Sequence, residues 1–338
     1  MTVADLETLG PGDEQAEVPR DSSGKKITGR SPSRIALERL RKDKVAIVSG
    51  AIVLILVLAA IFAPLILKIF GIGGPYETRG VQDLDLATGG YPAVGPPFHP
   101  FTWDHPLGLT PNTAYDNLAR LLYGLRVSLG IALGATLFSS IIGIVMGLLA
   151  GFARGWVDRI ISFTIDLFLS FPFLLGALAL APIITSRFAT QQDKLKWVQF
   201  FTLMFVLVIF SWMYLARLIR GQVLSLRERE FVQSAQVLGA PTSRILFNEL
   251  LPNLIAPIVV SVSLTLPGFV AAEAGLSFLG IGITGFPSLG QTILRASDYY
   301  KNYPLYFYAP VLIVTVLVVT LNMLGDSVRD AFDPRTRR

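Results

Sequence analysis

The sequence contains no cysteine, so a disulfide framework and a zinc site built on thiolates are both excluded. It also has little charge: 16% of its 338 residues are charged, whereas soluble globular domains usually carry about 25%. Hydrophobic residues make up 52%, and the mean hydropathy is +0.57. The low charge indicates that much of the surface faces lipid. The 22 phenylalanines and 30 glycines fit helices that pack closely in a membrane.

Motifs suited to catalysis or metal binding are also lacking. The only histidines, His99 and His105, lie in a proline-rich segment, and we interpret them as turn and surface residues rather than metal ligands. The nearest approach to a phosphate-binding loop is SSGKK at 22–26. It has Pro19 where the first glycine should stand and Lys26 where a hydroxyl should bind magnesium. We therefore expect no catalytic residue and no metal site in this chain.

The basic residues do not form a nucleic-acid surface. The formal net charge is +5, and Lys and Arg cluster at 20–44, at 217–244 and at the C-terminus. They do not form a basic face interleaved with aromatic residues, and no zinc-finger, helix-turn-helix or RNP pattern is present. We interpret these clusters as cytoplasmic anchors of membrane helices, following the positive-inside rule.

The chain divides into five parts. Residues 1–33 are rich in Gly, Pro, Ser and acidic residues, and we expect a disordered cytoplasmic tail because they bury too little apolar surface. Residues 34–67 combine a basic amphipathic helix with the first transmembrane helix. Residues 68–125 form an extracytoplasmic connection of turns and short extended pieces. Residues 126–325 hold a five-helix core, and residues 326–338 form a cytoplasmic tail.

Six segments are apolar and long enough to cross about 30 Å of hydrocarbon. They are expected at 45–67, 127–152, 160–184, 198–219, 254–280 and 308–325. Pro172 predicts a kink in the third span, and glycines spaced four apart in the second predict close helix packing. Because Lys and Arg concentrate before the first span and in the connections on that side, both termini are predicted to be cytoplasmic. The fold class is therefore an all-α membrane protein with six transmembrane helices.

A polar segment, REREFVQSAQVLGAPTSRILFNELLPN at 227–253, separates the fourth and fifth spans. We call it the elbow. Residues 230–238 predict a short helix, one face of which carries Phe231, Ala235 and Leu238. Such an apolar stripe fits either a groove on another protein or a layer of lipid headgroups, and the pattern does not choose between them.

The short helix is expected to end in a sharp corner. Gly239 suits the left-handed conformation that terminates helices, and Pro241 prevents the helix from continuing. Thr242 or Ser243 could then cap a second helix that begins near Arg244 and leads into the fifth span.

The elbow resembles the EAA loop of ABC importer permeases, in which Glu-Ala-Ala is followed by three residues, a Gly and, at a fixed interval, a Leu-Pro pair. The matching residues are Gln233, Ser234, Ala235, Gly239, Leu251 and Pro252. Gln233 and Ser234 replace the usual Glu and Ala, so the spacing is kept while the carboxylate is lost. Other stretches resemble the C-type subunit of the dipeptide/oligopeptide permease family: HPLG, SWMYLARLIRGQVLSLRERE, AAEAGLSFLGIGI and LNMLGDSVRDAFDPR. The resemblance covers about residues 35–338.

The resemblance implies a type I ABC importer permease in the bacterial cytoplasmic membrane. It implies a non-catalytic pore subunit that works with a second permease, two cytoplasmic ATPase subunits and an extracytoplasmic solute-binding protein. ATP and Mg would be used by the ATPase subunits, and no cofactor would be bound by this chain. Di- and oligopeptides are the default substrates, while nickel, glutathione, sugars and peptide-like antibiotics also occur in the family. The elbow would be the coupling helix, with ATPase contacts implied for Phe231, Gln233, Ser234, Ala235, Leu238, Gly239, Ala240, Pro241 and Arg244.

Three ionisable side chains fall within the predicted spans, where charge is costly and often functional. Asp166 and Arg217 are expected to pair near the cytoplasmic side and to tie the third span to the fourth; the alternative is a substrate contact. Glu273 is the deepest carboxylate of the fifth span. It either lines the pathway or hydrogen-bonds a neighbouring helix.

Two other classes of function compete with an importer subunit. A stand-alone secondary transporter or channel would need coupling-ion sites or inverted repeats, and neither is found in the sequence. A structural scaffold or membrane sensor would need neither six spans nor a docking elbow. Dependence on a separate ATPase would distinguish the importer subunit from a carrier that works alone.

Overall fold

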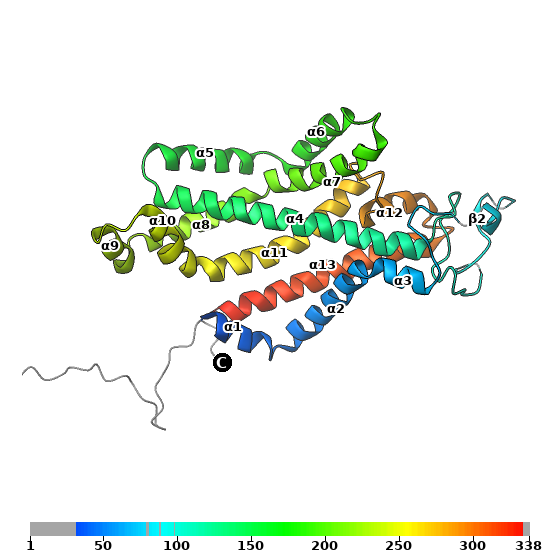
Figure 1. The fold of residues 1–338 in the computed structure, drawn as a ribbon, viewed down its shortest axis with the longest axis horizontal. Helices are drawn as coiled ribbons and strands as arrows, with labels where there is room; N and C mark the ends of the chain where they lie inside the picture. Colours follow the sequence, from blue (N-terminus) through cyan, green and yellow to red (C-terminus); the bar gives the residue numbers. More distant parts are fainter. Residues whose placement is uncertain (1–31, 79–80, 88, 98, 334–338) are drawn as a thin grey trace, which may run out of the picture.

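The computed structural model describes residues 32–333, apart from 79–80, 88 and 98. The N-terminal tail was expected to be disordered over residues 1–33, and residues 1–31 of it lie outside the described residues. Long helices run roughly along one axis of the molecule, as Figure 1 shows. The elbow projects at one end of this bundle, and the connection that precedes α4 (Asn117–Phe152) covers the other end.

The helices follow the sequence pattern closely. The first part of the chain contains α1 (Pro32–Leu40), α2 (Lys44–Ile61) and α3 (Ala63–Ile69). The helices after α4 are α5 (Trp156–Ser170), α6 (Phe173–Ser186), α7 (Gln192–Ile209), α8 (Trp212–Leu226), α9 (Glu230–Val237), α10 (Thr242–Arg244), α11 (Leu251–Phe278), α12 (Leu289–Ala296) and α13 (Pro304–Phe332). A π-helical stretch, η3 (Ile245–Leu250), joins α10 to α11.

Within the described residues, five helical segments are long and apolar enough to cross a membrane. They are Lys44–Ile61, Asn117–Phe152, Lys194–Leu226, Thr242–Phe278 and Pro304–Phe332. The pair α5 and α6 passes the same test only when taken together, and its two helices meet at an angle of 92°. This pair is a broken span or a re-entrant loop.

The corner between α5 and α6 lies at Phe171 and Pro172. Phe171 is extended (φ −86°, ψ 127°), because the proline ring disfavours a helical conformation in the residue before it. Pro172 also lacks the N–H that a continuous helix would need. The predicted kink is confirmed, but it is a full corner between two helices rather than a bend within one.

Several helices extend beyond the predicted spans. α4 begins at Asn117 rather than near 127, since the Asp116 carboxylate accepts a hydrogen bond from the Ala119 N–H at 2.9 Å and caps the helix there. α13 continues to Phe332, so the part of the predicted C-terminal tail at 326–332 is helical, and 334–338 lies outside the described residues. Hydropathy locates only the lipid-embedded part of such helices.

The connection between α3 and α4 consists of short elements, as predicted. They are a 3₁₀ turn, η2 (Val81–Asp83), and an antiparallel pair of strands, β1 (Leu84–Asp85) and β2 (Tyr91–Pro92), with Leu84 opposite Pro92. The interpretation of His105 as a surface residue is wrong. His105 is buried, and its Nδ1 lies 3.0 Å from an oxygen of Asp116, so it supports the residue that caps α4.

The junction of α1, α2 and α13 ties the two ends of the described chain together. The Arg39 guanidinium donates to the carbonyl oxygen of Asp333 at 2.9 Å and to that of Ala331 at 3.3 Å. Asp43 caps α2 by accepting from the Val45 N–H at 2.9 Å. Hydrogen bonding from Ser327, on α13, is the largest cause of a lowered pKa at Asp43.

The most extensive contact between two helices is that of α4 with α8. Gly143, Gly147 and Gly151 lie on one face of α4, and Gly147 and Gly151 face Ile219 and Val223 of α8. A Cβ atom added at Gly147 would lie 2.6 Å from the Ile219 Cβ and 2.7 Å from the Ala216 carbonyl oxygen. The close packing predicted from the glycine spacing is therefore confirmed here.

We expect Gly147→Ala to lower the melting temperature of the purified protein in detergent. The added methyl group would overpack the α4–α8 contact and lower the free energy of unfolding by about 1–3 kcal/mol. Gly221→Ala, on α8, is the matched control, since no heavy atom lies within 4 Å of the Cβ position there. Equal melting temperatures for the two variants would contradict this account of the helix contact.

Candidate functional site

The elbow has the predicted corner. Gly239 adopts a left-handed conformation with φ of 74°. Its N–H donates to the carbonyl oxygen of Gln236, and the Ala240 N–H donates to that of Ala235, both at 3.0 Å. These two bonds satisfy carbonyl groups at the end of α9 in the manner of a Schellman motif, which explains why glycine stands at this position.

The second helix of the elbow begins earlier than predicted. α10 starts at Thr242 with Pro241 as its N-cap, and no side chain caps it, so the expected capping by Thr242 or Ser243 is wrong. Helical structure then continues from α10 through η3 into α11 without an intervening loop. α10 is therefore joined to α11 by unbroken helical structure.

The elbow is anchored to the bundle through a face of α9 that shares only Ala235 with the predicted apolar stripe. Val232 is fully buried and Ala235 is half-buried, in a cluster with Ile219 and Val223 of α8 and Leu250 of η3. Val232 and Ala235 are three residues apart and so share a helix face. The predicted stripe is thus divided: Ala235 contacts the bundle, while Phe231 and Leu238 face outward.

The outward face of the elbow exposes large apolar side chains. Val237 and Leu238 are 87% and 85% exposed, and Phe231 is 39% exposed. The remaining residues assigned to ATPase contact are also exposed, except for the half-buried Ala240; they are Gln233, Ser234, Gly239, Pro241 and Arg244. Apolar residues presented on a projecting corner are typical of an interaction surface.

Two acid–arginine pairs join α5 to α8. Asp166 and Arg217 form an ion pair, as predicted, and both side chains are largely exposed in the isolated chain. A second pair was not foreseen: Arg220 donates to both oxygens of Asp158, at 2.8 and 3.2 Å. The residue spacing could have predicted this second pair. The two acids are eight residues apart on α5 and the two arginines three apart on α8, so each set falls on one helix face.

Glu273 hydrogen-bonds a neighbouring helix, which was one of the two alternatives. Its carboxylate is fully buried and accepts from the Ser128 hydroxyl of α4 at 2.6 Å and from Ser277 at 2.8 Å. The Leu289 N–H, at the start of α12, donates to the Ser128 oxygen at 3.1 Å. The group therefore fastens α4, α11 and α12 together, and it does not line the cavity described next.

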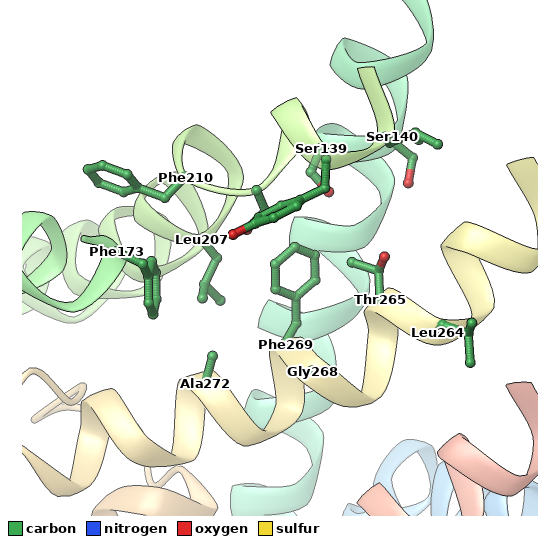
Figure 2. A pocket seen from close by; sticks show the side chains of 13 residues that line it. Ser139, Ser140, Phe173, Leu207, Phe210, Leu264, Thr265, Gly268, Phe269 and Ala272 are labelled. Carbon is green, nitrogen blue, oxygen red and sulfur yellow. The ribbon is translucent and has the colours of Figure 1, made fainter. Parts of the chain in front are cut away.

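A cavity of about 340 Å³ opens between α4, α11 and the α6–α8 segment. Figure 2 shows the rings of Phe173, Phe210 and Phe269 and the hydroxyl groups of Ser139 and Thr265 around it. Tyr214 and Ser211 add two further hydroxyl groups, and no charged side chain lines it. Sequence reasoning did not find these residues, although hydroxyl groups within apolar spans were a usable signal.

No metal centre is formed within the described ranges. No three side chains of the His, Cys, Asp and Glu types come close enough together there to hold an ion. The contact between His105 and Asp116 is a pair that belongs to the cap of α4.

Comparisons with known proteins agree on one family. Residues 143–338 match the binding-protein-dependent transport system inner membrane component, and residues 31–87 match the N-terminal transmembrane domain of oligopeptide transport permease C. The chain is 31% identical over 311 residues to the dipeptide transport system permease protein DppC of Alkalihalophilus pseudofirmus, covering 92% of each chain. It is 30% identical over 316 residues to the oligopeptide transport system permease protein OppC of Bacillus subtilis, covering 93% of each.

A solved structure has the same fold. The MetNI methionine ABC transporter in an inward-facing conformation matches with a TM-score of 0.51 and 20% sequence identity, over 63% of this chain and 96% of that one.

Removing the Glu273 carboxylate should destabilise the bundle. We expect Glu273→Ala to cost about 1–3 kcal/mol, because the buried hydroxyl groups of Ser128 and Ser277 lose their acceptor, and Glu273→Gln to cost less. The check is thermal unfolding in detergent together with a transport assay on several substrates. Altered substrate preference with unchanged stability would instead favour the pathway alternative.

The Asp166–Arg217 pair can be tested by a double-mutant cycle. Asp166→Asn and Arg217→Gln should each lower stability slightly, by about 1 kcal/mol or less for so exposed a pair. The double variant should cost little more than either single variant, because the interaction is already lost. Melting temperatures of the four proteins provide the measurement, and fully additive losses would contradict a stabilising pair.

Proposed function

The chain belongs to the family of binding-protein-dependent transport system inner membrane components, and from this premise we propose that it forms one half of the translocation pathway of an ATP-driven importer for di- or oligopeptides. It is a multi-pass inner-membrane permease of the ABC transporter class. Peptide is the substrate class proposed because the relatives are named as dipeptide and oligopeptide permeases.

The single observation that carries the coupling mechanism is the anchoring of the elbow. Leu238, at the C-cap of α9, is exposed, while Val232 of α9 is buried against Ile219 and Val223 of α8. α8 also supplies Tyr214 to the cavity. A push on the outward face of α9 would therefore tilt the same helix that lines the pathway, and α11 would move with it through η3.

In this proposal the outward face of the elbow sits in a groove of a cytoplasmic ATPase subunit. ATP binding would close a pair of ATPase subunits, move two elbows, one in each permease, and switch the pathway from inward to outward access. ATP and Mg would be used by those subunits, and this chain would hold neither. A solute-binding protein would deliver the substrate at the opposite face.

The proposed topology has six spans with both termini in the cytoplasm. The bent α5–α6 pair counts as the third span, broken at Pro172. The elbow then lies on the cytoplasmic side, together with the Lys and Arg that flank it, in agreement with the positive-inside rule.

The cavity suits a substrate whose side chains vary. Its rings offer apolar surface, and the hydroxyl groups of Ser139, Tyr214 and Thr265 can bond to peptide carbonyl and amide groups. Because no charged side chain lines it, neither acidic nor basic side chains of a peptide would be selected there. Selection would then lie mainly with the solute-binding protein.

We expect Leu238→Lys to abolish co-purification of the ATPase subunits without loss of folding, since the side chain is 85% exposed and would place a charge in the docking groove. Leu86→Lys, 72% exposed in the connection at the opposite end, is the matched control. The readouts are the subunits recovered from native membranes in mild detergent and the melting temperature of each variant.

Retention of the ATPases by Leu238→Lys would remove the elbow as the docking site. A stable wild-type chain recovered with no ATPase at all would favour a carrier that works alone, and the elbow would then be a helix lying on lipid.

A further inference from the structure

A second cavity lies toward the end of the bundle opposite the elbow, between α4, α7 and the segment that links α11 to α12. Its volume is about 640 Å³, larger than that of the cavity in Figure 2. Five aromatic rings line it: those of Tyr76, Tyr123, Trp197, Phe200 and Phe286. We call it the outer cavity. It shares no lining residue with the cavity of the proposed pathway, so it can bind a different molecule from the transported substrate.

The outer cavity carries positive charge without a matching acid. Arg126 is the one charged side chain in its lining; it is exposed and forms no ion pair with any described residue. The Lys196 ammonium lies beside the cavity, 5.6 Å from the centre of the ring of Phe286, which lines it. Neither cation forms an ion pair with a carboxylate in the described part of the chain. An anionic group is the complement that these two side chains lack.

The depth of the cavity in the membrane suits a phospholipid. Arg126 and Trp197 each stand next to the first residue of a predicted span, at the level where aromatic rings and basic side chains meet lipid headgroups. The Trp197 and Phe201 rings are stacked, with centres 6.4 Å apart. The site therefore presents Arg126 and the Trp197 ring at the headgroup level, and Phe200 and Phe201 lie in the first turn of the predicted span that follows.

An apolar surface leads from the cavity toward the middle of the bilayer. Gly130 lines the cavity on α4, and Leu133 and Leu137 follow it on the same helix face, 49% and 57% exposed. Phe201 of the neighbouring α7 is 54% exposed. A chain of methylene groups that entered among the rings could continue along this surface.

We propose that the outer cavity binds one anionic phospholipid of the outer leaflet, with its phosphate beside Arg126 and an acyl chain among the rings and along the Gly130–Leu137 face of α4. The leaflet follows from the proposed topology, while lipid binding itself does not depend on the elbow or on ATPase docking.

The test is native mass spectrometry of the complex purified from its membrane and supplied with phosphatidylglycerol or phosphatidylcholine. Phosphatidylglycerol is expected to be retained preferentially, and Arg126→Gln to reduce that preference about fivefold, the effect of one basic residue at an anionic surface. Arg187→Gln is the matched control, an exposed arginine at the end of α6 that lies outside the cavity. Equal retention of both lipids, or an equal effect of the two substitutions, would overturn the proposal.

A second variant separates the acyl chain from the headgroup. Gly130→Leu should weaken retention of both lipids, because its side chain would fill the cavity, and its Cβ fits at ordinary distances of 3.7 and 3.8 Å from Phe200. A photo-reactive residue in place of Trp197 should cross-link to lipid. Cross-links to the second permease or to a peptide substrate would show another occupant and overturn the proposal, whatever the outcome of the ATPase experiment.

Discussion

The close contact between α4 and α8 is the constraint on which the other features depend. Because glycines on α4 leave no side chain in the way, the two backbones approach until Gly147 faces Ile219 directly. In lipid this contact gains little from the hydrophobic effect, so its stability comes from packing. α8 is thereby packed closely against α4 along much of its length. Its Val223 packs against the elbow, and its Arg217 and Arg220 form the ion pairs with α5. It also forms one wall of the cavity.

The two ends of the bundle are held together in different ways. Near the elbow, aliphatic side chains such as Val232 and Leu250 form the anchor, and the polar pairs lie at its margin. Toward the other end, the Glu273 carboxylate and its serine partners fasten three helices at the start of α12. Aliphatic packing has no fixed direction, whereas hydrogen bonds do. The geometry of the α12 end is therefore set by hydrogen-bond direction, and that of the elbow anchor by the fit of its side chains.

The sequence predicted what depends on local chemistry. The corner at Gly239, the break at Pro172 and the glycine contact at Gly147 each follow from the conformational limits of one residue type. It did not predict which face of α9 is buried, because Val232 and Phe231 are both apolar and only the neighbouring helices decide. The cavity was missed for a related reason: it is assembled from α4, α6, α7, α8 and α11, which no local pattern connects.

The π-helical stretch at Ile245–Leu250 has a further consequence. Residues within an α-helix keep a fixed angular phase of about 100° per step, and a π-helical stretch interrupts that phase because its bonds span five residues. α10 and α11 are thus out of angular register although no loop separates them, whereas the corner at Gly239 separates α9 from both. The direction in which α11 presents Thr265 and Phe269 is therefore offset from the direction that an uninterrupted α-helix starting at Thr242 would give.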